Sequence, residues 1–518
     1  MDAGRSVARW LAPTLLDCVL ISLLVWQFAA GGRWITLLAD GDTGWHIRTG
    51  EYILDERQWP RQDLFSFSKP GDPWFAWEWL ADVAFAVTFR AAGLSGVAVL
   101  AALAIVLAAL ILFRRMLRLG ANTFIAMIVL MLALGAASIH FLARPHVFTL
   151  LAWSLSWSLI ERDRAQPGRP VWWLVPLTLV WVNVHGGFVA LLASLGLWTA
   201  AVAVECWIEG ARRLPDFRPA WRYASLVATC AAVSLVNPYG WRLHAHIAAY
   251  LRSEWIRRVV DEFQSPKFRS EYSLYFELLL FAALMAAPAF LKRRRLAEPA
   301  LALFWGHAAL VSARHVPLFV LLAGPWVAAE ASLLWRRWAS RAGPRSVPAI
   351  LDSVSEDLRA GFARLSPWAA VGIAVVLLAT PTSQWPQDFP AQKFPVEIVS
   401  RHADLLRGTR VFTSDQWADY LIYRFYPHQK VYFDGRSDFY GSRLGDEYLK
   451  IVQGKTGWRE SLDRWGFHYA LIPEEWPLAG LLGCSGEWEL VERKGPAVLY
   501  RRVGMEAALK KSPRQAEL

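Results

Sequence analysis

Residues 94–113 read LSGVAVLAALAIVLAALILF, and residues 114–118, which follow them, read RRMLR. An uncharged run of 20 residues is long enough to cross the hydrocarbon core of a bilayer, about 30 Å thick, as a single helix. A cluster of arginines directly after such a run is typical of a transmembrane segment, because basic residues collect in cytoplasmic loops. Further apolar runs along the chain end in the same way. The sequence therefore predicts a polytopic α-helical membrane protein.

The composition of the 518 residues supports this class. Hydrophobic residues make up 55% of the chain and charged residues 19%, and the mean hydropathy is +0.27, whereas soluble proteins carry about a quarter charged residues. The net charge of +11 lies in short loops between apolar stretches, which indicates membrane topology and not nucleic-acid binding. The 29 tryptophans fit side chains that favour membrane interfaces. Four cysteines are too few for a disulfide framework.

Eleven apolar segments are expected to cross the membrane. The first is interpreted as a retained helix and not as a signal peptide, because no small-residue cleavage site and soluble mature chain follow it. Several segments are shorter than 17 residues, so their ends are expected to extend into the flanking polar sequence. The segments are residues 11–30, 94–113, 122–138, 147–160, 171–184, 188–208, 223–236, 274–291, 299–311, 317–335 and 368–379.

Loop charge gives the orientation. Five basic loops fall on one side of the membrane if the N-terminus is cytoplasmic, and after eleven crossings the C-terminal domain is then extracytoplasmic. The long first loop, residues 31–93, fits the outer side with nine acidic and six basic residues. The loop over residues 237–273 does not fit, because it lies outside and is nevertheless basic. The five basic loops are residues 114–118, 161–169, 212–222, 292–295 and 336–345.

Three domains or regions are expected. Residues 1–380 form the membrane domain, and within its first loop residues 77–92 are interpreted as an interfacial helix, because charged residues interrupt the apolar pattern. Residues 381–504 have the composition of a small soluble α/β domain, and residues 505–518 form a disordered tail. In the soluble domain a helix is expected over residues 415–425. Strands are expected over residues 410–413, 430–433, 469–472, 488–492 and 497–501.

The polar clusters of the outer side lead to the functional hypothesis. Membrane anchoring explains the arginines of the cytoplasmic side. It does not explain carboxylates, imidazoles and amides that gather at segment ends on the other side. We therefore expect an outward-facing polar site at the membrane boundary. Its clusters are residues 40–46 (DGDTGWH), 77–79 (WEW), 144–146 (RPH), 183–187 (NVHGG), 237–240 (NPYG) and 314–315 (RH).

Two acidic motifs are catalytic candidates. Asp40 and Asp42 follow the first apolar segment, and a carboxylate there can act as general base toward a hydroxyl or amine. Alternatively, both could hold Mg²⁺ or Mn²⁺ together with His46, or one of them could cap the helix that begins near Gly44. Glu78 lies between two tryptophans that could stack on a sugar ring. Its structural alternative is an acid at a helix N-terminus beside membrane-anchoring tryptophans.

Arginines and histidines of the same side are substrate-binding candidates. Arg144 and Arg314 suit a phosphate group, because guanidinium binds phosphate in a bidentate way. Arg257 and Arg258 in the basic outer loop could bind the same head group or anionic lipids. The histidine candidates are His46, His146, His185 and His315, and for His146 and His185 a structural role in a turn is the alternative.

In the soluble domain, residues 414–420 (SDQWADY) and 433–438 (FDGRSD) stand out. An Asp-Gly pair after a strand is a common turn, which favours a structural role, although the domain could still select the acceptor. The sequence holds no phosphate-cradling glycine loop, no zinc-ligand spacing and no Ser–His–Asp arrangement. A nucleotide-hydrolysing enzyme is therefore not expected.

Together these motifs resemble the GT-C superfamily of polytopic membrane glycosyltransferases, which includes protein mannosyltransferases, lipid A aminoarabinose transferases and oligosaccharyltransferases. Members carry an acidic motif just after the first helix, then interfacial helices, and use lipid-phosphate-linked sugars. By this likeness Asp42, with Asp40, matches the acidic motif, and Glu78 matches a second carboxylate of some members. Residues 42–67 look like bacterial proteins grouped loosely with this superfamily. The Trp-Trp-Asp-type motif of oligosaccharyltransferases is not found in residues 381–504, which argues against transfer of whole oligosaccharides to asparagine.

The resemblance implies a glycosyltransferase on the outer face of a bacterial cytoplasmic membrane. Its donor would be a polyprenyl-phosphate sugar and its acceptor an envelope lipid, glycan or protein. Asp42 would be base or metal ligand, Glu78 a second acid, and Arg144 and Arg314 would bind the phosphate. Two alternatives stay open. One is a transporter or flippase of a lipid-linked glycan, for which Asp17 is the clearest ionisable residue inside a segment. The other is a non-catalytic envelope-assembly protein.

Overall fold

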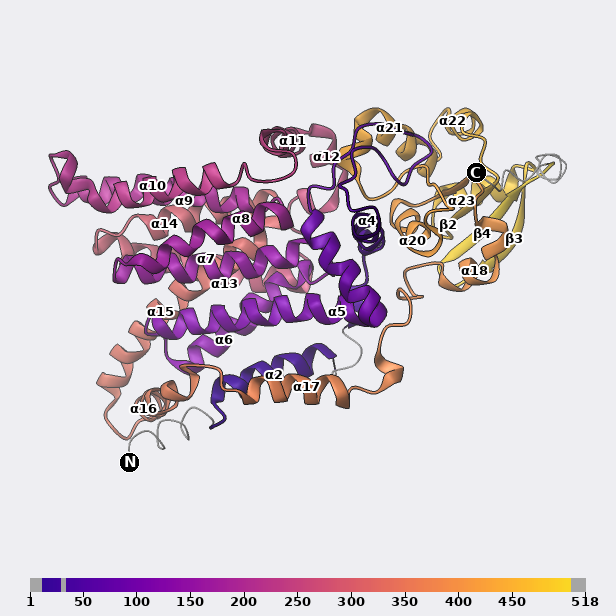
Figure 1. The fold of residues 1–518 in the computed structure, drawn as a ribbon. Coiled ribbons are helices and arrows are strands. Elements are labelled where there is room, and N and C mark those ends of the chain that lie inside the picture. Colours follow the sequence, from indigo (N-terminus) through magenta and orange to yellow (C-terminus); the bar gives the residue numbers. More distant parts are fainter. Residues whose placement is uncertain (1–11, 29–33, 505–518) are drawn as a thin grey trace. The chain divides into compact units, whose positions relative to one another are not determined.

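The computed structural model describes residues 12–28 and 34–504 (Figure 1). Within these residues helices predominate, and four strands near the C-terminus form one sheet. This confirms the predicted class of a mostly helical protein with several apolar helices and a small C-terminal sheet. The tail expected from residue 505 lies outside the described residues.

Each apolar segment of the sequence is helical where the structure describes it. By length and composition, five of the described helices could cross a membrane, and α2 and α17 are shorter apolar helices. The number of crossings stays a prediction. The helices that hold the segments are α2 (Leu15–Phe28), α5 (Trp79–Arg118), α6 (Thr123–Ala137), α7 (His146–Ala165), α8 (Leu174–Val184), α9 (Phe188–Ile208), α10 (Arg218–Val233), α13 (Glu271–Lys292), α14 (Ala297–Val311), α15 (Val316–Ala342) and α17 (Trp368–Ala379).

Helix α5 consists of two helices joined by a break. Ala92 has φ −149° and Gly93 has φ 59°, a left-handed conformation that glycine adopts without steric cost. The first helix of the pair therefore ends where the sequence pattern placed the end of the 77–92 helix. Its location in the membrane interface stays a prediction.

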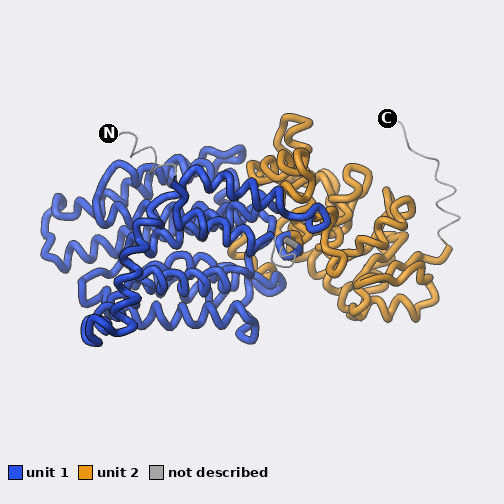
Figure 2. Tube along the Cα trace, turned by 90° about the horizontal axis from the view of Figure 1, so that it is seen from below, with its two compact units in different colours: residues 1–37, 98–249, 257–385 blue, residues 38–97, 250–256, 386–518 orange. Residues whose placement is uncertain are grey.

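The chain divides into two compact units (Figure 2). Unit 1 contains Met1–Leu37, Ala98–Ala249 and Arg257–Trp385. Unit 2 contains Leu38–Val97, Tyr250–Ile256 and the chain from Pro386 onward. Most of the first loop is thus part of the same compact unit as the C-terminal sheet.

Tryptophans form part of the core of unit 1. Trp153, Trp157 and Trp198 are almost fully buried. The ring centroid of Trp157 lies 5.6 Å from those of Trp153 and Trp198, in each case edge to face, which is a favourable aromatic geometry. Membrane interfaces therefore account for only part of the tryptophan content.

Several arginines of the basic loops bind buried acids in unit 1, so membrane anchoring is not the whole explanation of these arginines. In three pairs a guanidinium donates two or more hydrogen bonds of 2.6–3.2 Å to one carboxylate. Such bidentate pairs are strong and directional. The pairs are Arg115–Glu161, Arg222–Asp163 and Arg293–Glu330.

The sheet of unit 2 has the order β1-β2-β4-β3. Strand β1 (Val411–Thr413) is parallel to β2 (Tyr469–Pro473), and β4 (Ala497–Arg502) is antiparallel to both β2 and β3 (Trp488–Lys494). The prediction of a strand over residues 430–433 was wrong, because no strand forms there. Val431 makes a single bridge with Ser66, because its N–H and C=O pair with Phe65 and Phe67 of the first loop instead of the sheet.

Two helices of unit 2 position the site. Helix α20 (Asp415–Phe425) has the predicted bounds, and the Ser414 hydroxyl caps it by accepting a hydrogen bond from Trp417 N. It packs against α4 (Asp42–Glu56).

The remaining elements are α3 (Trp34–Leu37), α11 (Trp241–Arg252), α12 (Glu254–Val259), α16 (Val347–Arg359), α18 (Val396–Arg401), α19 (Ala403–Leu406), α21 (Ser437–Val452), α22 (Trp458–Arg464), α23 (Pro477–Cys484) and the short 3₁₀ helices η1 (Ser138–His140), η2 (Arg169–Trp173), η3 (Leu214–Phe217), η4 (Asp261–Phe263), η5 (Ala313–His315), η6 (Ala360–Phe362) and η7 (Thr382–Gln384).

Candidate functional site

The acidic motif of the first loop lies at the beginning of α4. Asp42 is the first residue of this helix, and the Asp40 carboxylate accepts a hydrogen bond of 3.0 Å from Asp42 N. Gly41 is the N-cap residue and provides no side-chain cap, so the Asp40 contact is a local hydrogen bond in the turn before the helix. Gly44 lets α4 approach α20 closely, since a Cβ atom at Gly44 would lie 2.6 Å from the carbonyl oxygen of Asp419. The motif thus brings Asp42 against α20.

Asp42 and Asp419 converge on Gly435. Both residues are buried. A Cβ atom at Gly435 would lie 2.0 Å from Asp42 Oδ1 and 2.8 Å from Asp419 Oδ2, so the two carboxyl groups face one point, which only glycine leaves open. Gly435 N donates a hydrogen bond of 3.1 Å to Asp419 Oδ1, whereas Asp419 Oδ2 has no hydrogen-bond partner in the described residues. Asp42, Asp419 and Asp434 are called the carboxylate cluster.

The carboxyl groups of the carboxylate cluster cannot all ionise easily at the same time. Burial raises the pKa of Asp419 well above its ordinary value, and the charges of Asp42 and Asp434 raise it further. Burial likewise raises the pKa of Asp415, one helical turn earlier in α20. Two carboxyl groups that share such a site favour a protonated and an ionised partner. This arrangement can supply a base and an acid side by side.

A buried arginine balances part of this charge. Arg436 donates to both carboxylate oxygens of Asp434, at 2.8 and 2.6 Å, and lies 2.8 Å from Asp63. Its guanidinium also lies 4.6 Å from the ring centroid of Trp74. Asp63 and Trp74 belong to the first loop, so Arg436 joins that loop to the C-terminal part within unit 2. The Asp-Gly turn of the sequence analysis therefore has a structural role and also lines the carboxylate cluster.

His46 lies between two carboxylates. Its Nδ1 atom is 2.6 Å from Asp82 Oδ1, and its Nε2 atom is 3.7 Å from Glu78 Oε2. All three side chains are buried. A carboxylate on one ring nitrogen orients a histidine and stabilises its charged form. Glu78 is therefore part of a buried polar group, beyond its place at a helix N-terminus.

A cation site at Asp40, Asp42 and His46 stays a prediction. The Asp40 carboxylate accepts a hydrogen bond from Asp42 N, and His46 contacts Asp82 and Glu78. Among residues 12–28 and 34–504, no group of three or more His, Cys, Asp or Glu side chains is arranged to hold a metal ion.

Unit 1 contains a second polar cluster. Glu262 Oε1 lies 3.7 Å from Arg314, and Glu262 Oε2 lies 3.8 Å from His140. Arg144 and His185 act electrostatically on the same carboxylate. The ring of His146 lies 5.1 Å from that of His140 and 6.5 Å from that of His185. The structure thus brings together four of the candidate substrate-binding residues. The arginine–histidine cluster consists of His140, Arg144, His146, His185, Glu262 and Arg314.

The histidines of this cluster also have structural contacts. The Nδ1 atom of His185 lies 2.8 Å from the Thr149 hydroxyl and accepts a hydrogen bond from Gly187 N. Burial lowers the pKa of His185 to about 3, so this side chain is neutral at physiological pH. The Nε2 atom of His146 lies 2.7 Å from the carbonyl oxygen of His140. These contacts fit the structural alternative, which leaves the arginines as the charged groups.

Three other candidates lie at the edge of this cluster or apart from it. The Nδ1 atom of His315 lies 3.2 Å from the carbonyl oxygen of Ala308, and its ring packs against Trp305. Arg257 and Arg258 are exposed on α12. Their side chains therefore suit contact with a head group or lipid more than a buried site.

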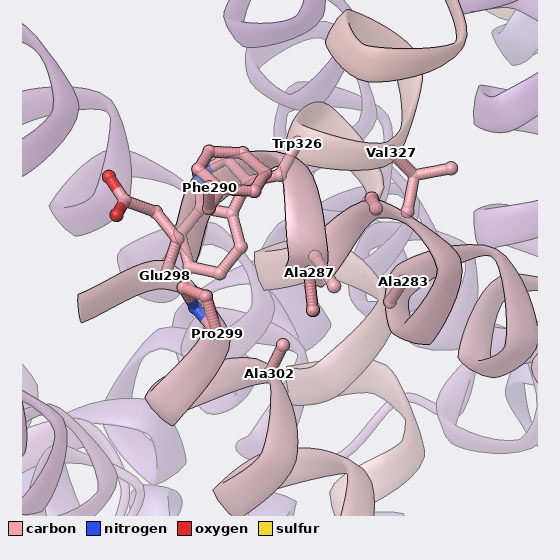
Figure 3. A pocket seen from close by; sticks show the side chains of 10 residues that line it. Ala283, Ala287, Phe290, Glu298, Pro299, Ala302, Trp326 and Val327 are labelled. Carbon is pink, nitrogen blue, oxygen red and sulfur yellow. The ribbon is translucent and has the colours of Figure 1, made fainter. Parts of the chain in front are cut away.

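A small pocket in unit 1 lies between α13, α14 and α15 (Figure 3). Its lining is apolar apart from Glu298, whose carboxylate accepts hydrogen bonds from Arg295. None of the candidate site residues lines it. Asp17, on which the transporter alternative rested, accepts hydrogen bonds from Ser366 N and Ser366 Oγ. Its side chain is thus occupied in a helix-end contact.

Sequence reasoning missed three important acids. Asp82 follows Glu78 by one helical turn, which places both on one face, and Asp419 follows Asp415 by the same spacing. Both spacings could have pointed to Asp82 and Asp419 from the sequence alone. Glu262 has no such signal, because only the fold brings its loop to Arg314.

No protein-family model matches the chain, and no curated protein sequence matches it. Among solved structures, the archaeal oligosaccharyltransferase AglB from Archaeoglobus fulgidus, in complex with an inhibitory peptide and a dolichol-phosphate, is similar with a TM-score of 0.51 and 12% identity. The similarity covers 89% of this chain and 69% of that one, and an AglB structure tethered with an acceptor peptide gives the same values. ArnT from Cupriavidus metallidurans bound to undecaprenyl phosphate has a TM-score of 0.49 at 12% identity, over 97% of this chain and 99% of that one.

At this identity the likeness to AglB concerns the fold. The chain thus has a fold similar to that of the oligosaccharyltransferase AglB. Five of its described helices are long and apolar enough to cross a bilayer, which fits a multi-pass membrane protein.

Proposed function

We propose that this chain is a glycosyltransferase of a bacterial cytoplasmic membrane. It transfers a sugar from a polyprenyl-phosphate-linked donor to an envelope acceptor, which is a lipid, a glycan or a protein. The observation that carries this proposal is the convergence of the buried Asp42 and Asp419 carboxyl groups on Gly435. The GT-C fold supports the class of donor.

The proposed topology has eleven crossings, a cytoplasmic N-terminus and an extracytoplasmic C-terminal domain. It supports the reaction, because it places the first loop with Asp42 and the domain over residues 381–504 on the same, outer side. The basic loops on the other side support the orientation. In this topology residues 77–92 lie along the outer interface.

Asp42 is the general base in the proposed step. Its carboxylate takes the proton of an acceptor O–H or N–H group, and the acceptor forms a bond to C1 of the sugar. The bond between C1 and the phosphate oxygen breaks, and the polyprenyl phosphate leaves with that electron pair. The configuration at C1 is inverted. The phosphate is already an activated leaving group, so the step needs no nucleotide.

Neighbouring side chains keep Asp42 ready for this role. A protonated Asp419 beside it keeps the negative charge on Asp42, because two adjacent carboxyl groups do not ionise equally. Glu78, with His46 held by Asp82, is proposed to orient the acceptor through the polar group that these three residues form. We assign no step to a divalent cation.

The arginine–histidine cluster is proposed to bind the donor phosphate. Arg144 and Arg314 remain charged at physiological pH, and a guanidinium matches the geometry of phosphate oxygens. His146, His185 and His315 support these side chains, and Arg257 and Arg258 contact the head group from their exposed helix.

Transfer of label tests the proposal. The purified protein in lipid is incubated with radiolabelled polyprenyl-phosphate sugars and an envelope extract, and Asp42→Asn is compared with the wild type. Asp55→Asn is the matched control, because Asp55 lies on the same helix but is exposed and pairs with Arg90. We expect transfer by the wild type and the control and none by Asp42→Asn.

Other results would contradict parts of the proposal. Equal transfer by Asp42→Asn would keep the glycosyltransferase and exclude Asp42 as its base. The absence of transfer from every donor by a folded wild-type protein would favour the transport or assembly alternative.

A further inference from the structure

Glu262 is the one acid of the arginine–histidine cluster, among the described residues, and it is held loosely. Its two closest contacts to basic side chains, Arg314 and His140, are 3.7 and 3.8 Å long. Both exceed the length of a hydrogen bond. About a quarter of its side chain, 24%, is exposed. The carboxylate thus lies beside the Arg314 guanidinium without a direct hydrogen bond to it.

Other acid–arginine pairs of unit 1 are held by short hydrogen bonds, unlike Glu262. Arg115–Glu161 and Arg293–Glu330 each have two hydrogen bonds of 2.6–2.9 Å. Those pairs have the geometry of permanent structural links. Glu262 lies instead on η4, a 3₁₀ helix of three residues, and only its backbone is fixed, by the Ser312 hydroxyl that donates to its carbonyl oxygen.

The charge of Glu262 is well defined. Burial alone would raise the pKa of this carboxyl group, but the positive charges of Arg314 and Arg144 lower it to about 2. The group is therefore ionised at every physiological pH. A carboxylate and a phosphate accept the same charge-assisted hydrogen bonds from guanidinium, so Glu262 occupies the electrostatic place of an anionic ligand.

We propose that Glu262 is a displaceable counter-ion, which a phosphate ester replaces at Arg144 and Arg314 and which returns when the phosphate leaves. This inference rests on the proposed function, since the phosphate ester is the head group of the polyprenyl donor. Rotation of the Glu262 side chain is sufficient for the exchange, because its backbone contacts do not involve the carboxylate.

The exchange favours product release. The donor is a phosphodiester with one negative charge, whereas the leaving polyprenyl phosphate is a monoester that gains a second charge. The monoester would bind the arginines more tightly than the donor and block the site. A carboxylate that competes for the same arginines weakens both ligands and shortens the time for which the product stays.

Binding of undecaprenyl phosphate to the full-length protein in detergent micelles tests this inference. Dissociation constants are measured by native mass spectrometry for the wild type, Glu262→Gln and Glu262→Ala. Asp261→Asn is the matched control, because Asp261 is the exposed neighbour on the same 3₁₀ helix and pairs with Lys267. Undecaprenol, which lacks the phosphate, controls for the lipid tail, and inorganic phosphate separates a free anion from the lipid head group.

We expect both Glu262 variants to bind undecaprenyl phosphate about tenfold more tightly, which corresponds to about 1.4 kcal/mol of removed competition. The control variant and undecaprenol binding should not change. Unchanged or weaker binding by the folded Glu262 variants would overturn the inference and leave the proposed function intact. A gain seen only for inorganic phosphate would also overturn it. If the folded wild type and all variants fail to bind undecaprenyl phosphate, the phosphate site of the proposed function fails as well.

Discussion

Replacing Arg436 by alanine should destabilise unit 2 strongly. The arginine is 3% exposed, donates to both oxygens of Asp434 and lies 2.8 Å from Asp63. Its removal leaves two buried carboxylates without their cation. Removing one partner of a buried ion pair costs about 3–5 kcal/mol, because a buried charge is left uncompensated. We expect the free energy of unfolding of unit 2 to fall by about this amount.

Urea-dependent pulse proteolysis of the full-length protein in detergent measures this change, with cleavage followed within residues 386–504. Arg464→Ala is the control, since its ion pair with Glu447 is also short, at 2.9 Å, but its side chain is 65% exposed. An exposed pair contributes about 0–1 kcal/mol. If Arg436→Ala lost no more stability than Arg464→Ala, the account of Arg436 as the link between the first loop and the C-terminal part would be refuted.

Three further predictions concern the two clusters. The raised pKa of Asp419 means that the folded protein holds this proton more tightly than the unfolded chain does. The free energy of unfolding therefore falls as the pH rises from the ordinary pKa of 3.8 through the raised pKa, by up to about 1.4 kcal/mol per pH unit. Asp419→Asn should therefore gain thermal stability over the wild type between pH 4 and pH 8, and a gain that does not depend on pH would contradict this. Gly435→Ala should displace the Asp42 carboxylate, cost about 1–3 kcal/mol of stability and abolish transfer, whereas Gly480→Ala, which has open space around it inside helix α23, should leave transfer unchanged and should not lower stability, because alanine is favoured over glycine in a helix by up to about 1 kcal/mol. Arg144→Lys and Arg314→Lys should each weaken undecaprenyl phosphate binding about tenfold through loss of the bidentate geometry, and equal affinity in a titration would exclude the arginine as a phosphate ligand.

The helical part of the fold follows from local sequence. Apolar runs of membrane-spanning length, Gly93 after the interfacial pattern and the Ser414 cap of α20 are each encoded within a few residues. For this reason the helices and the class of fold could be predicted. The conformation of residues 430–433 could not be predicted, because Val431 pairs with Ser66 of the first loop. An apolar run alone does not show which segment it pairs with.

The candidate site was predictable only in part. Position after the first helix made Asp42 a candidate, and the basic character of the segment ends that are predicted to be outside made Arg144 and Arg314 candidates. Asp419 reaches Asp42 only because Gly44 allows α4 to pack against α20, a contact between distant parts of the chain. Local sequence could not show that the Asp40 carboxylate accepts a hydrogen bond from Asp42 N, because base, metal ligand and helix cap were all compatible with the motif.

In the proposed reaction a sugar leaves a polyprenyl phosphate and joins an envelope acceptor. Mass spectrometry that counts both products of the purified protein tests it most directly. With a polyprenyl-phosphate monosaccharide and an envelope extract, we expect free polyprenyl phosphate and glycosylated acceptor to appear in equal amounts, and neither to appear with Asp42→Asn. Donor that stays intact with folded wild-type protein, or polyprenyl phosphate released without any glycosylated acceptor, would contradict the account.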